Sequence, residues 1–521
     1  MNTIILTLVT FVPAAGALAL MIMPRNDKAL KWTALIVTLV AFVLSLYLPL
    51  YFQRGQQGFQ YEIDVNWISS PHINYHLGID GISLWLVLLT TLLTPLCVLI
   101  QWDSIHGRVR DFLVLMLLLE TAMIGVFVAL DLFLFYVFWE ATLIPMALMI
   151  GMYGHERRVY AAVKFFLYTM VASMFMLAGI IWLYVHVHGP SGQGTFDFVT
   201  IKNALDSGQV ANFAPAAQFL FLGFFIAFAV KVPLFPFHTW LPDAHVEAPT
   251  AGSVLLAGVL LKMGTYGLLR FNVTLFPVQA RENAAWINVL AIIGIIYGAL
   301  VALVQPNMKK LVAYSSVSHL GFCVLGIFTF TVSGTDGAVY QMLNHGVSTG
   351  ALFMLLGMLY DRRHTYEIVE YGGLATPMPI YATLFLFMTL SSVGLPLLNG
   401  FVGEFLVLSG AFGTSAWYGL FATTGVIWSA GYLLWLYQRT FYGTIKNPVN
   451  ERLPDANARE QLCLIPLCVL ALIMGVASPL WMRQIDPSVT AAIAGVSKTN
   501  AQTIYKSTGQ SAELHTDSTK R

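Results

Sequence analysis

The sequence predicts an all-α polytopic membrane protein of about fourteen transmembrane helices, with two inverted five-helix repeats and two broken helices. Of its 521 residues, 57% are hydrophobic and only 10% are charged, against roughly 25% charged residues in an ordinary soluble domain. Apolar runs of about 20 residues recur along the whole chain, and a run of that length crosses a hydrocarbon core about 30 Å thick. Lipid is therefore the main solvent of this protein.

Apolar runs between charged residues and Gly, Pro or Asn breaks define the expected helices. The longest interruptions are residues 53–81 and 187–215, and most other connections are short. The fourteen expected spans are residues 3–23, 30–52, 82–101, 111–130, 132–151, 161–186, 216–241, 249–271, 286–305, 308–331, 337–360, 378–412, 418–441 and 462–482.

Lys and Arg residues are distributed unequally between the two sets of loops. If the first loop is cytoplasmic, only Arg54, Lys202, Arg270 and Arg281 fall in the opposite loops before the carboxyl tail. Positive residues concentrate in cytoplasmic loops, so both termini should face away from the cytoplasm. The fifteen residues of the cytoplasmic set are Arg25, Lys28, Lys31, Arg108, Arg110, Arg157, Arg158, Lys309, Lys310, Arg362, Arg363, Arg439, Lys446, Arg452 and Arg459.

Two expected helices contain helix-breaking residues at mid-membrane depth. The seventh span contains Lys231-Val-Pro-Leu-Phe-Pro-Phe-His238, and the twelfth contains Gly394-Leu-Pro-Leu-Leu-Asn-Gly-Phe-Val-Gly-Glu404. Proline removes a backbone donor and clashes with the preceding turn, so both helices should be interrupted. Broken helices in corresponding halves of a membrane protein indicate an ion or substrate path near the midplane, although ordinary proline kinks would explain the same residues.

The five-span separation of the two breaks predicts two inverted five-helix repeats. Spans four to eight would form one repeat and spans nine to thirteen the other. The expected divisions are residues 1–110 for the first three helices, 111–271 for the first repeat, 286–442 for the second repeat, 443–485 for a loop and the last helix, and 486–521 for a polar tail rich in Ser, Thr, Lys and Gln.

Four charged residues lie well inside expected spans: Glu140, Lys231, Lys262 and Glu404. A charged group at the bilayer centre costs at least about 2.5–3.5 kcal/mol, so such residues usually mark a functional site. Glu140 and Lys231 have opposite signs, and each favours the ionised form of the other while burial favours the neutral form. Lys231 is therefore predicted to change its protonation as Glu140 approaches or retreats. Lys262 has no acidic neighbour in its own helix and is predicted to be a proton relay.

Two histidines fall in the helices between Lys262 and Glu404. His319 lies in span ten and His345 in span eleven, and imidazole gives and takes protons near neutral pH. Either histidine alone would be explained as a hydrogen-bonded packing residue. Together they favour a relay that ends at Glu404, beside the second broken helix, where free backbone groups can hold water.

Several other functions lack their usual residues. The chain has no GxGxxG, GxxxxGK[ST] or HExxH motif, so nucleotide and zinc-hydrolase chemistry are not indicated. The formal net charge of +1 gives no reason to expect a nucleic-acid partner. No CxxC motif is present, and any redox cofactor is expected to belong to a partner protein. The four cysteines all lie in apolar runs: Cys97, Cys323, Cys463 and Cys468.

The run from Lys231 to Thr250, with Lys262 in the following helix, resembles the signature of the antiporter-like subunits of respiratory complex I. Residues 78–83, 307–316 and 400–404 extend the resemblance, which covers nearly the whole chain from about residue 70 to about residue 445. It implies an inverted five-helix repeat, which agrees with the spacing of the two breaks.

The resemblance also implies a role for each buried group. Glu140 and Lys231 would form the input pair, Lys262 the central relay and Glu404 the outlet, with two histidines between the last two. NADH oxidation and quinone reduction would take place in partner subunits, so FMN, iron–sulfur clusters and quinone are expected there and no cofactor in this chain. The implied partners are the other membrane-arm subunits, above all the neighbouring antiporter-like ones. The implied location is a bacterial inner membrane, with both termini on the periplasmic side.

Two alternatives stay open from the sequence. A subunit of a multisubunit cation/proton antiporter or of a membrane-bound hydrogenase would share the core motifs, although Glu404 and the chain length favour complex I. A purely structural scaffold, in which buried charges only lock helices together, would explain the same charges without proton transfer.

Overall fold

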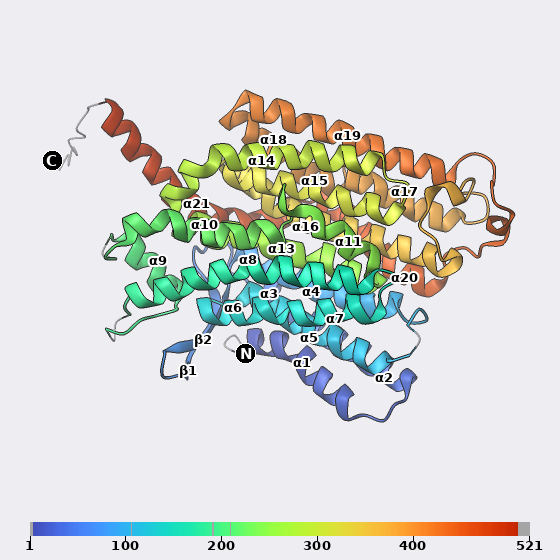
Figure 1. Ribbon diagram of the computed structural model, residues 1–521, viewed down its shortest axis with the longest axis horizontal. Coiled ribbons are helices and arrows are strands. Elements are labelled where there is room, and N and C mark those ends of the chain that lie inside the picture. Colours follow the sequence, from blue (N-terminus) through green and yellow to red (C-terminus); the bar gives the residue numbers. More distant parts are fainter. Residues whose placement is uncertain (1–3, 106, 190–191, 209, 509–521) are drawn as a thin grey trace, which may run out of the picture.

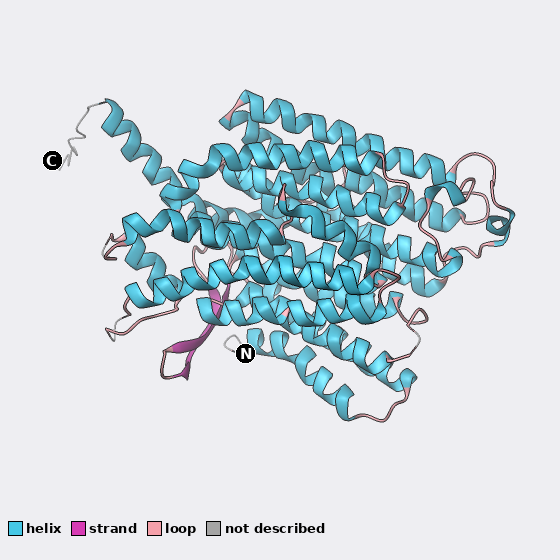
Figure 2. Cartoon of the chain, viewed as in Figure 1, coloured by secondary structure: helices cyan, strands magenta, loops and turns pink. Residues whose placement is uncertain are grey.

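The computed structural model describes residues 4–105, 107–189, 192–208 and 210–508. It is a bundle of long helices that lie roughly parallel to one another (Figure 1), and helices make up most of the described chain (Figure 2). Among the described residues, thirteen helical spans are long and apolar enough to cross a membrane. Each coincides with one of the expected spans, so the all-α membrane fold is confirmed.

The helices and strands follow the chain in this order. The elements up to the first break are α1 (Ile5–Ile22), α2 (Asp27–Ser45), α3 (Tyr47–Tyr51), β1 (Gln60–Ile68), β2 (Ile73–Ile79), α4 (Gly81–Ile100), α5 (Val109–Val128), α6 (Leu132–Ala141), α7 (Leu143–Tyr153), α8 (Arg158–His186), α9 (Phe198–Asp206) and α10 (Phe213–Lys231). The helices after it are η1 (Phe237–Thr239), α11 (Trp240–Glu247), α12 (Thr250–Leu255), η2 (Leu256–Leu260), α13 (Leu261–Gly267), η3 (Leu268–Val273), α14 (Pro277–Leu303), α15 (Met308–Phe328), α16 (Val332–Arg363), η4 (Ile368–Glu370), α17 (Pro379–Val393), α18 (Asn399–Thr414), α19 (Ala416–Phe441), η5 (Pro448–Arg452), α20 (Ala458–Val476) and α21 (Pro479–Thr508).

Both expected breaks are present, and the second accounts for the one expected span, of fourteen, that is absent from the thirteen. α10 ends at Lys231 and regular α-helix resumes only in α11, with Pro233 and Pro236 in the gap. The expected span 378–412 is two helices, α17 and α18, each too short to cross a membrane alone. α17 ends at Val393, and the φ of 86° at the following residue, Gly394, is a left-handed conformation that favours glycine. The inverted relation of the two five-helix groups stays a prediction.

The eighth span contains an irregularity that the sequence did not reveal. It runs from Thr250 to Val273 and is entirely buried, but two stretches, η2 and η3, have π-helical hydrogen bonding. These stretches flank α13, the short α-helical piece that carries Lys262. π-Helical turns are rare and frequently lie at functional sites.

Polar residues in the loops fix where several spans begin. Asp80, Asn307 and Asn457 accept hydrogen bonds from the first backbone N–H groups of α4, α15 and α20. These donors have no partner within the helix, so the side chains satisfy groups that lipid cannot.

The two long interruptions are partly structured. Residues 53–81 contain the antiparallel hairpin β1–β2, with Asp64 opposite His76 in the register, and residues 187–215 contain α9. The hairpin, α9 and the outer end of α21 lie at the same end of the bundle, on the left of Figure 1.

The prediction that residues 486–521 form a polar tail is wrong for the first part of that range. The expected last helix, 462–482, is divided between α20 and α21, and α21 continues well past residue 486. Ile485, Val489, Ile493 and Val496 are buried at helical spacing, and α21 packs against α4, α14 and α16. The sequence analysis did not detect this apolar face of α21, because polar residues on the other faces of the helix dominate the composition of the segment. The tail residues 509–521 lie outside the described part of the chain.

Burial differs strongly between the central and the outer helices. The spans of α16 and of residues 250–273 are fully buried, and that of α15 is 94% buried. By contrast, the spans of α2, α8, α19 and α20 are 33–39% buried, so their exposed apolar sides face the lipid. Side chains on α13, α15 and α16 are therefore in the interior of the bundle.

Candidate functional site

Five of the six candidate residues lie in the interior, and the sixth lies nearer the edge. Lys231, Lys262, His319, His345 and Glu404 are each at most 3% exposed, whereas Glu140 is half-buried. None of the five side chains can therefore face lipid, and their charge or hydrogen bonding must be satisfied within the protein.

Lys262 and His345 are in direct contact although they are 83 residues apart. The Lys262 Nζ atom, on α13, lies 2.6 Å from Nδ1 of His345, on α16, and it also donates to the carbonyl oxygen of Ala257 in the preceding π-helical turn. A hydrogen bond between two basic nitrogens needs only one proton between them, on the lysine or on the imidazole. This contact is therefore suited to proton transfer.

The two imidazoles are neighbours but are not directly hydrogen-bonded. The ring centroids of His319 and His345 are 5.9 Å apart. A cavity of about 10 Å³ lies between α15, α16 and the second break, which is close to the room that one water molecule needs. It is lined by His319, Gln341, Asn344, His345, Ser348, Thr349, Ser391, Ser392 and Gly400. A water in this polar cavity would complete the link between the imidazoles.

Glu404 is held by two side chains at the far end of this row. Its Oε1 atom lies 2.9 Å from Nδ1 of His319 and accepts a hydrogen bond of 3.0 Å from Nε2 of Gln341. Gly403 allows this geometry, because a Cβ atom there would lie 2.5 Å from the amide oxygen of Gln341. On the side of the His319 imidazole that faces away from Glu404, the hydroxyl groups of Ser392 and Tyr432 each lie 3.4 Å from Nε2.

The sequence reasoning missed a group of polar side chains at the second break. Ser391 is hydrogen-bonded at 2.6 Å to Ser348 and donates at 2.6 Å to Asn399. Ser348 and Ser391 line the cavity beside His345 and make its wall polar. The signal that could have found them is a cluster of Ser and Asn residues on both sides of Gly394 within an otherwise apolar run.

Glu140 and Lys231 lie near each other but are not in contact. The ion pairs within 4.0 Å that the described residues form do not include them. Lys231 Nζ instead lies 3.4 Å from the hydroxyl of Thr142 and 5.3 Å from the ring centroid of Trp139. The Oε1 atom of Glu140 is buried without a hydrogen-bond partner in the described structure. The structure therefore shows this pair in a separated arrangement.

Three further buried groups lie near the site or in neighbouring spans. His245, on α11, is fully buried, stacks on Phe353 at 4.4 Å, and has no hydrogen-bond partner in the described structure for either ring nitrogen. Lys309 was counted among the loop cations, but it is 2% exposed and donates to the carbonyl of Ala248 at 2.6 Å. Glu120, on α5, is fully buried, and its oxygens likewise have no partner among the described residues. The sequence analysis did not select His245 or Glu120 as a candidate site residue.

The hairpin carries a separate charged cluster outside the membrane spans. His76 Nδ1 lies 2.8 Å from Asp197 and its Nε2 lies 3.4 Å from Glu62. Burial lowers the pKa of His76, but hydrogen bonds and charges from the surrounding carboxylates, above all Asp197, outweigh burial and raise it above 6.5. Burial raises the pKa of Asp197, but its hydrogen bonds with His76 and Thr200 bring it below 3.8. This cluster joins the hairpin to the start of α9.

The comparisons with known proteins agree on one family. The family model described as "NADH:quinone oxidoreductase/Mrp antiporter, TM" matches residues 129–429. A protein of Rhodobacter capsulatus named NADH-quinone oxidoreductase subunit M is 47% identical over 497 residues, which cover 93% of this chain and 95% of the relative.

Solved structures give the same result. A chain of respiratory complex I from Thermus thermophilus with bound NADH is similar with a TM-score of 0.85 and 34% identity, covering 94% of this chain and 99% of that chain. A chain of the Mrp complex from Dietzia sp. DQ12-45-1b is similar with a TM-score of 0.78 and 23% identity, covering 95% of this chain and 52% of that chain. The second likeness shows a common fold.

Proposed function

The chain belongs to the NADH:quinone oxidoreductase/Mrp antiporter family of membrane subunits, and on this basis we propose that it transfers protons within the membrane arm of an NADH-quinone oxidoreductase. Its role corresponds to that of the relatives named subunit M. The observation that carries the proposal is the row of buried titratable groups from Lys262 through His345 and His319 to Glu404.

The row gives an order of proton movements. A proton on Lys262 Nζ passes to Nδ1 of His345 across 2.6 Å, which leaves a neutral lysine and a charged imidazole. The charged imidazole releases a proton to a water in the small cavity, and the water passes a proton on to His319. His319 then protonates Glu404 across 2.9 Å. A transfer partner must lie within about 2.6–3.2 Å or one water away, and every step meets that condition.

In this proposal, the distance between Glu140 and Lys231 controls proton movement along the row. When Glu140 moves away, the positive charge on Lys231 is no longer compensated, and the lysine tends to lose its proton or to repel positive charge along the row. When the carboxylate returns, the ammonium is stabilised. The partly exposed position of Glu140 at the edge of the bundle suits a group that responds to a neighbouring subunit.

The proposal also assigns location and partners. The protein spans the membrane many times, and the excess of Lys and Arg in the loops taken as cytoplasmic supports a bacterial inner-membrane location with both termini on the periplasmic side. Other membrane-arm subunits are its partners. FMN, iron–sulfur clusters and quinone belong to partner subunits.

The second candidate function is a subunit of a multisubunit cation/proton antiporter or of a membrane-bound hydrogenase. The fold shared with the Mrp complex supports an antiporter, but the higher identity and the nearly complete coverage of the complex I chain favour the first function. Purification separates the two, because only the first function predicts co-isolation with flavin and iron–sulfur subunits.

The direct test is proton translocation by the intact complex in liposomes. Replacing Lys262 with Met removes the titratable group but keeps much of its apolar length. We expect fewer protons translocated per NADH oxidised, with unchanged electron transfer from NADH to a water-soluble acceptor. A scaffold role predicts an unchanged proton yield from every variant that assembles, and that result would refute the proposal.

A further inference from the structure

A second line of polar side chains leads away from Lys262, along its own helix and towards the hairpin end of the bundle. Tyr266 follows Lys262 by four residues on α13, and residues at this spacing share one face of a helix. Arg270, on the π-helical stretch η3, comes next, and its Nε donates at 3.3 Å to the Tyr266 hydroxyl. The guanidinium is also paired at 2.5 Å with Asp80, the residue that caps α4. The line therefore runs from the centre of the bundle to the loop before α4.

A cavity of about 340 Å³ lies at the Asp80 end of this line. The hairpin, α9 and α21 contribute to its walls, and these elements lie at the left of Figure 1. Glu62 and Lys202 line the cavity with side chains that are 47% and 33% exposed. Asp80 and Arg270 line it with side chains that are 6% exposed. The cavity therefore reaches from the aqueous surface to the buried ion pair, and it has room for several water molecules.

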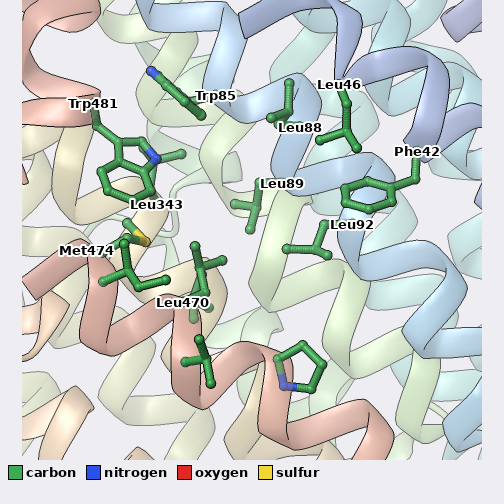
Figure 3. Close-up of a pocket in the computed structure, with 14 residues that line it drawn as sticks. Phe42, Leu46, Trp85, Leu88, Leu89, Leu92, Leu343, Leu470, Met474 and Trp481 are labelled. Carbon is green, nitrogen blue, oxygen red and sulfur yellow. The ribbon is translucent and has the colours of Figure 1, made fainter. Parts of the chain in front are cut away.

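An apolar groove also reaches α4, but it offers protons no path. Trp85, Leu89 and Leu92 form its wall on α4 (Figure 3), and the other lining residues belong to α2, α16, α20 and α21. All of them are Phe, Leu, Trp, Val, Pro, Ile or Met, which neither take up nor release a proton near neutral pH. Of these two cavities, the one at Asp80 is therefore the one through which protons could approach Lys262.

The hydrogen bonds around Arg270 hold this approach closed. The Tyr266 hydroxyl donates its one proton to the carbonyl oxygen of Phe127 and accepts from Arg270, both at 3.3 Å. One carboxylate oxygen of Asp80 accepts from backbone N–H groups of α4, and the other accepts from Arg270. A guanidinium does not release its proton in proteins. A proton moving from the cavity to Lys262 would have to break these bonds.

Aromatic rings fix the guanidinium in place. Its central carbon lies 5.0 Å from the ring centroid of Phe59, before the hairpin, and 5.4 Å from that of Tyr266. Both distances are within the range of cation–π attraction. Arg270 is thus held by two rings, a hydroxyl and a carboxylate, and its charge cannot easily swing out of the line.

We propose that the Arg270–Asp80 pair is a barrier that keeps protons on the hairpin side from returning to Lys262. This inference rests on the proposed function, in which protons leave at Glu404 and the hairpin side is the periplasmic side. Lys262 is then filled from the opposite side, and an open path from the cavity would let translocated protons flow back. An arginine in a narrow pore can exclude protons and cations in this way. The barrier leaves the 2.6 Å contact with His345 as the way onward for a proton on Lys262.

The test is the passive proton permeability of liposomes that contain the intact complex, measured without NADH. A potassium diffusion potential drives protons inward, and a trapped pH-sensitive dye reports the rate. The variant R270A/D80N replaces the guanidinium with space for water and keeps a residue type that caps α4. We expect proton entry to become about tenfold faster, which corresponds to a barrier lower by about 1.4 kcal/mol. Adding K262M should restore the rate of the unmodified complex, because the leak passes through Lys262.

The matched control is R362Q/E460Q. This second ion pair is also buried, with side chains 10% and 7% exposed and 2.7 Å between Nη2 and Oε2, but it joins α16 to α20 outside the cavity. Its loss should leave the passive permeability unchanged.

Three results would overturn the proposal. The first is an R270A/D80N complex with the permeability of the unmodified complex, and the second is a leak that persists when K262M is added. The third is an equal leak in R362Q/E460Q. If R270A/D80N does not assemble, R270Q/D80N removes the same charges, keeps a hydrogen-bonding side chain and is judged by the same results. Failure of the proposed function differs from all three, because it appears as an unchanged NADH-driven proton yield in K262M.

Discussion

Replacing His319 with Gln tests the relay at its most connected point. The imidazole lies 2.9 Å from Glu404 on one side and faces His345 across 5.9 Å between ring centroids on the other. Glutamine keeps a hydrogen-bonding group of similar reach next to Glu404, so the packing between α15 and α18 should survive. It cannot take up and release a proton near neutral pH, because an amide has no suitable pKa.

The expected magnitude follows from the contacts that are lost. A positioned proton donor or acceptor contributes about 10²–10⁴-fold to the rate of a transfer step, which is about 2.7–5.4 kcal/mol of barrier. The stability cost is smaller, about 1 kcal/mol, because the glutamine amide can still donate a hydrogen bond to Glu404 in place of the imidazole. Glu404 also keeps its hydrogen bond from Gln341. H319Q should therefore assemble normally and lose proton transfer through this subunit.

The assay is NADH-driven acidification of liposomes that contain the purified complex, with electron transfer measured in parallel. We expect the number of protons translocated per NADH oxidised to fall in H319Q. S316A is the matched control on α15, since the Ser316 hydroxyl only donates to the carbonyl of Val312 in its own helix. A fully assembled H319Q complex with the proton yield of the unmodified complex would show that the relay does not run through His319.

Three further predictions concern stability. The Arg270–Asp80 ion pair is buried, with 2.5 Å between Nη2 and Oδ2, so R270M should destabilise the protein by about 3–5 kcal/mol in thermal unfolding. The hairpin cluster should be most stable between about pH 4 and 6.5. Because the pKa of His76 is raised, its contribution to stability is lost as pH rises through that pKa. Because the pKa of Asp197 is lowered, its contribution to stability is lost as pH falls through that pKa. Hydrogen exchange of β2 measures this dependence. G81A should loosen α21, because a Cβ atom there would lie 1.7 Å from the backbone oxygen of Gln484, and faster hydrogen exchange in α21 would show it.

Each of these predictions has its own control and its own refuting result. R270M combined with D80N should recover part of the lost stability, and equal unfolding temperatures for both variants would contradict the assignment to an uncompensated Asp80. H76Q should remove the upper limit of the pH window, and an unchanged profile would exclude His76 as its origin. G431A has no atom within 4 Å of the added Cβ, and an equal effect of G431A and G81A on α21 would rule out the steric explanation.

The order of residues is enough to predict the membrane architecture and the chemically active groups of this protein. The length of an apolar run fixes whether it crosses the bilayer, so most spans were correct to within a few residues. The ninth helix, however, begins at Pro277 instead of residue 286, and the expected span 378–412 is two helices. Pro233, Pro236 and Pro396 determined where helices break, since proline cannot continue the backbone ladder. The high cost of charge in lipid singled out Lys231, Lys262 and Glu404. These properties are local or depend only on the solvent, and they can be read from the order of residues.

The contacts between these groups depend on how the helices pack, and they could not be predicted from the sequence. The contact between Lys262 and His345 joins residues 83 positions apart, and no local pattern fixes the rotation of two helices about their axes. The same reason explains the separated Glu140, the burial of Lys309 in a segment counted as a loop, and the buried face of α21. Packing of side chains from distant helices sets distances of a few ångströms, and proton transfer depends on those distances.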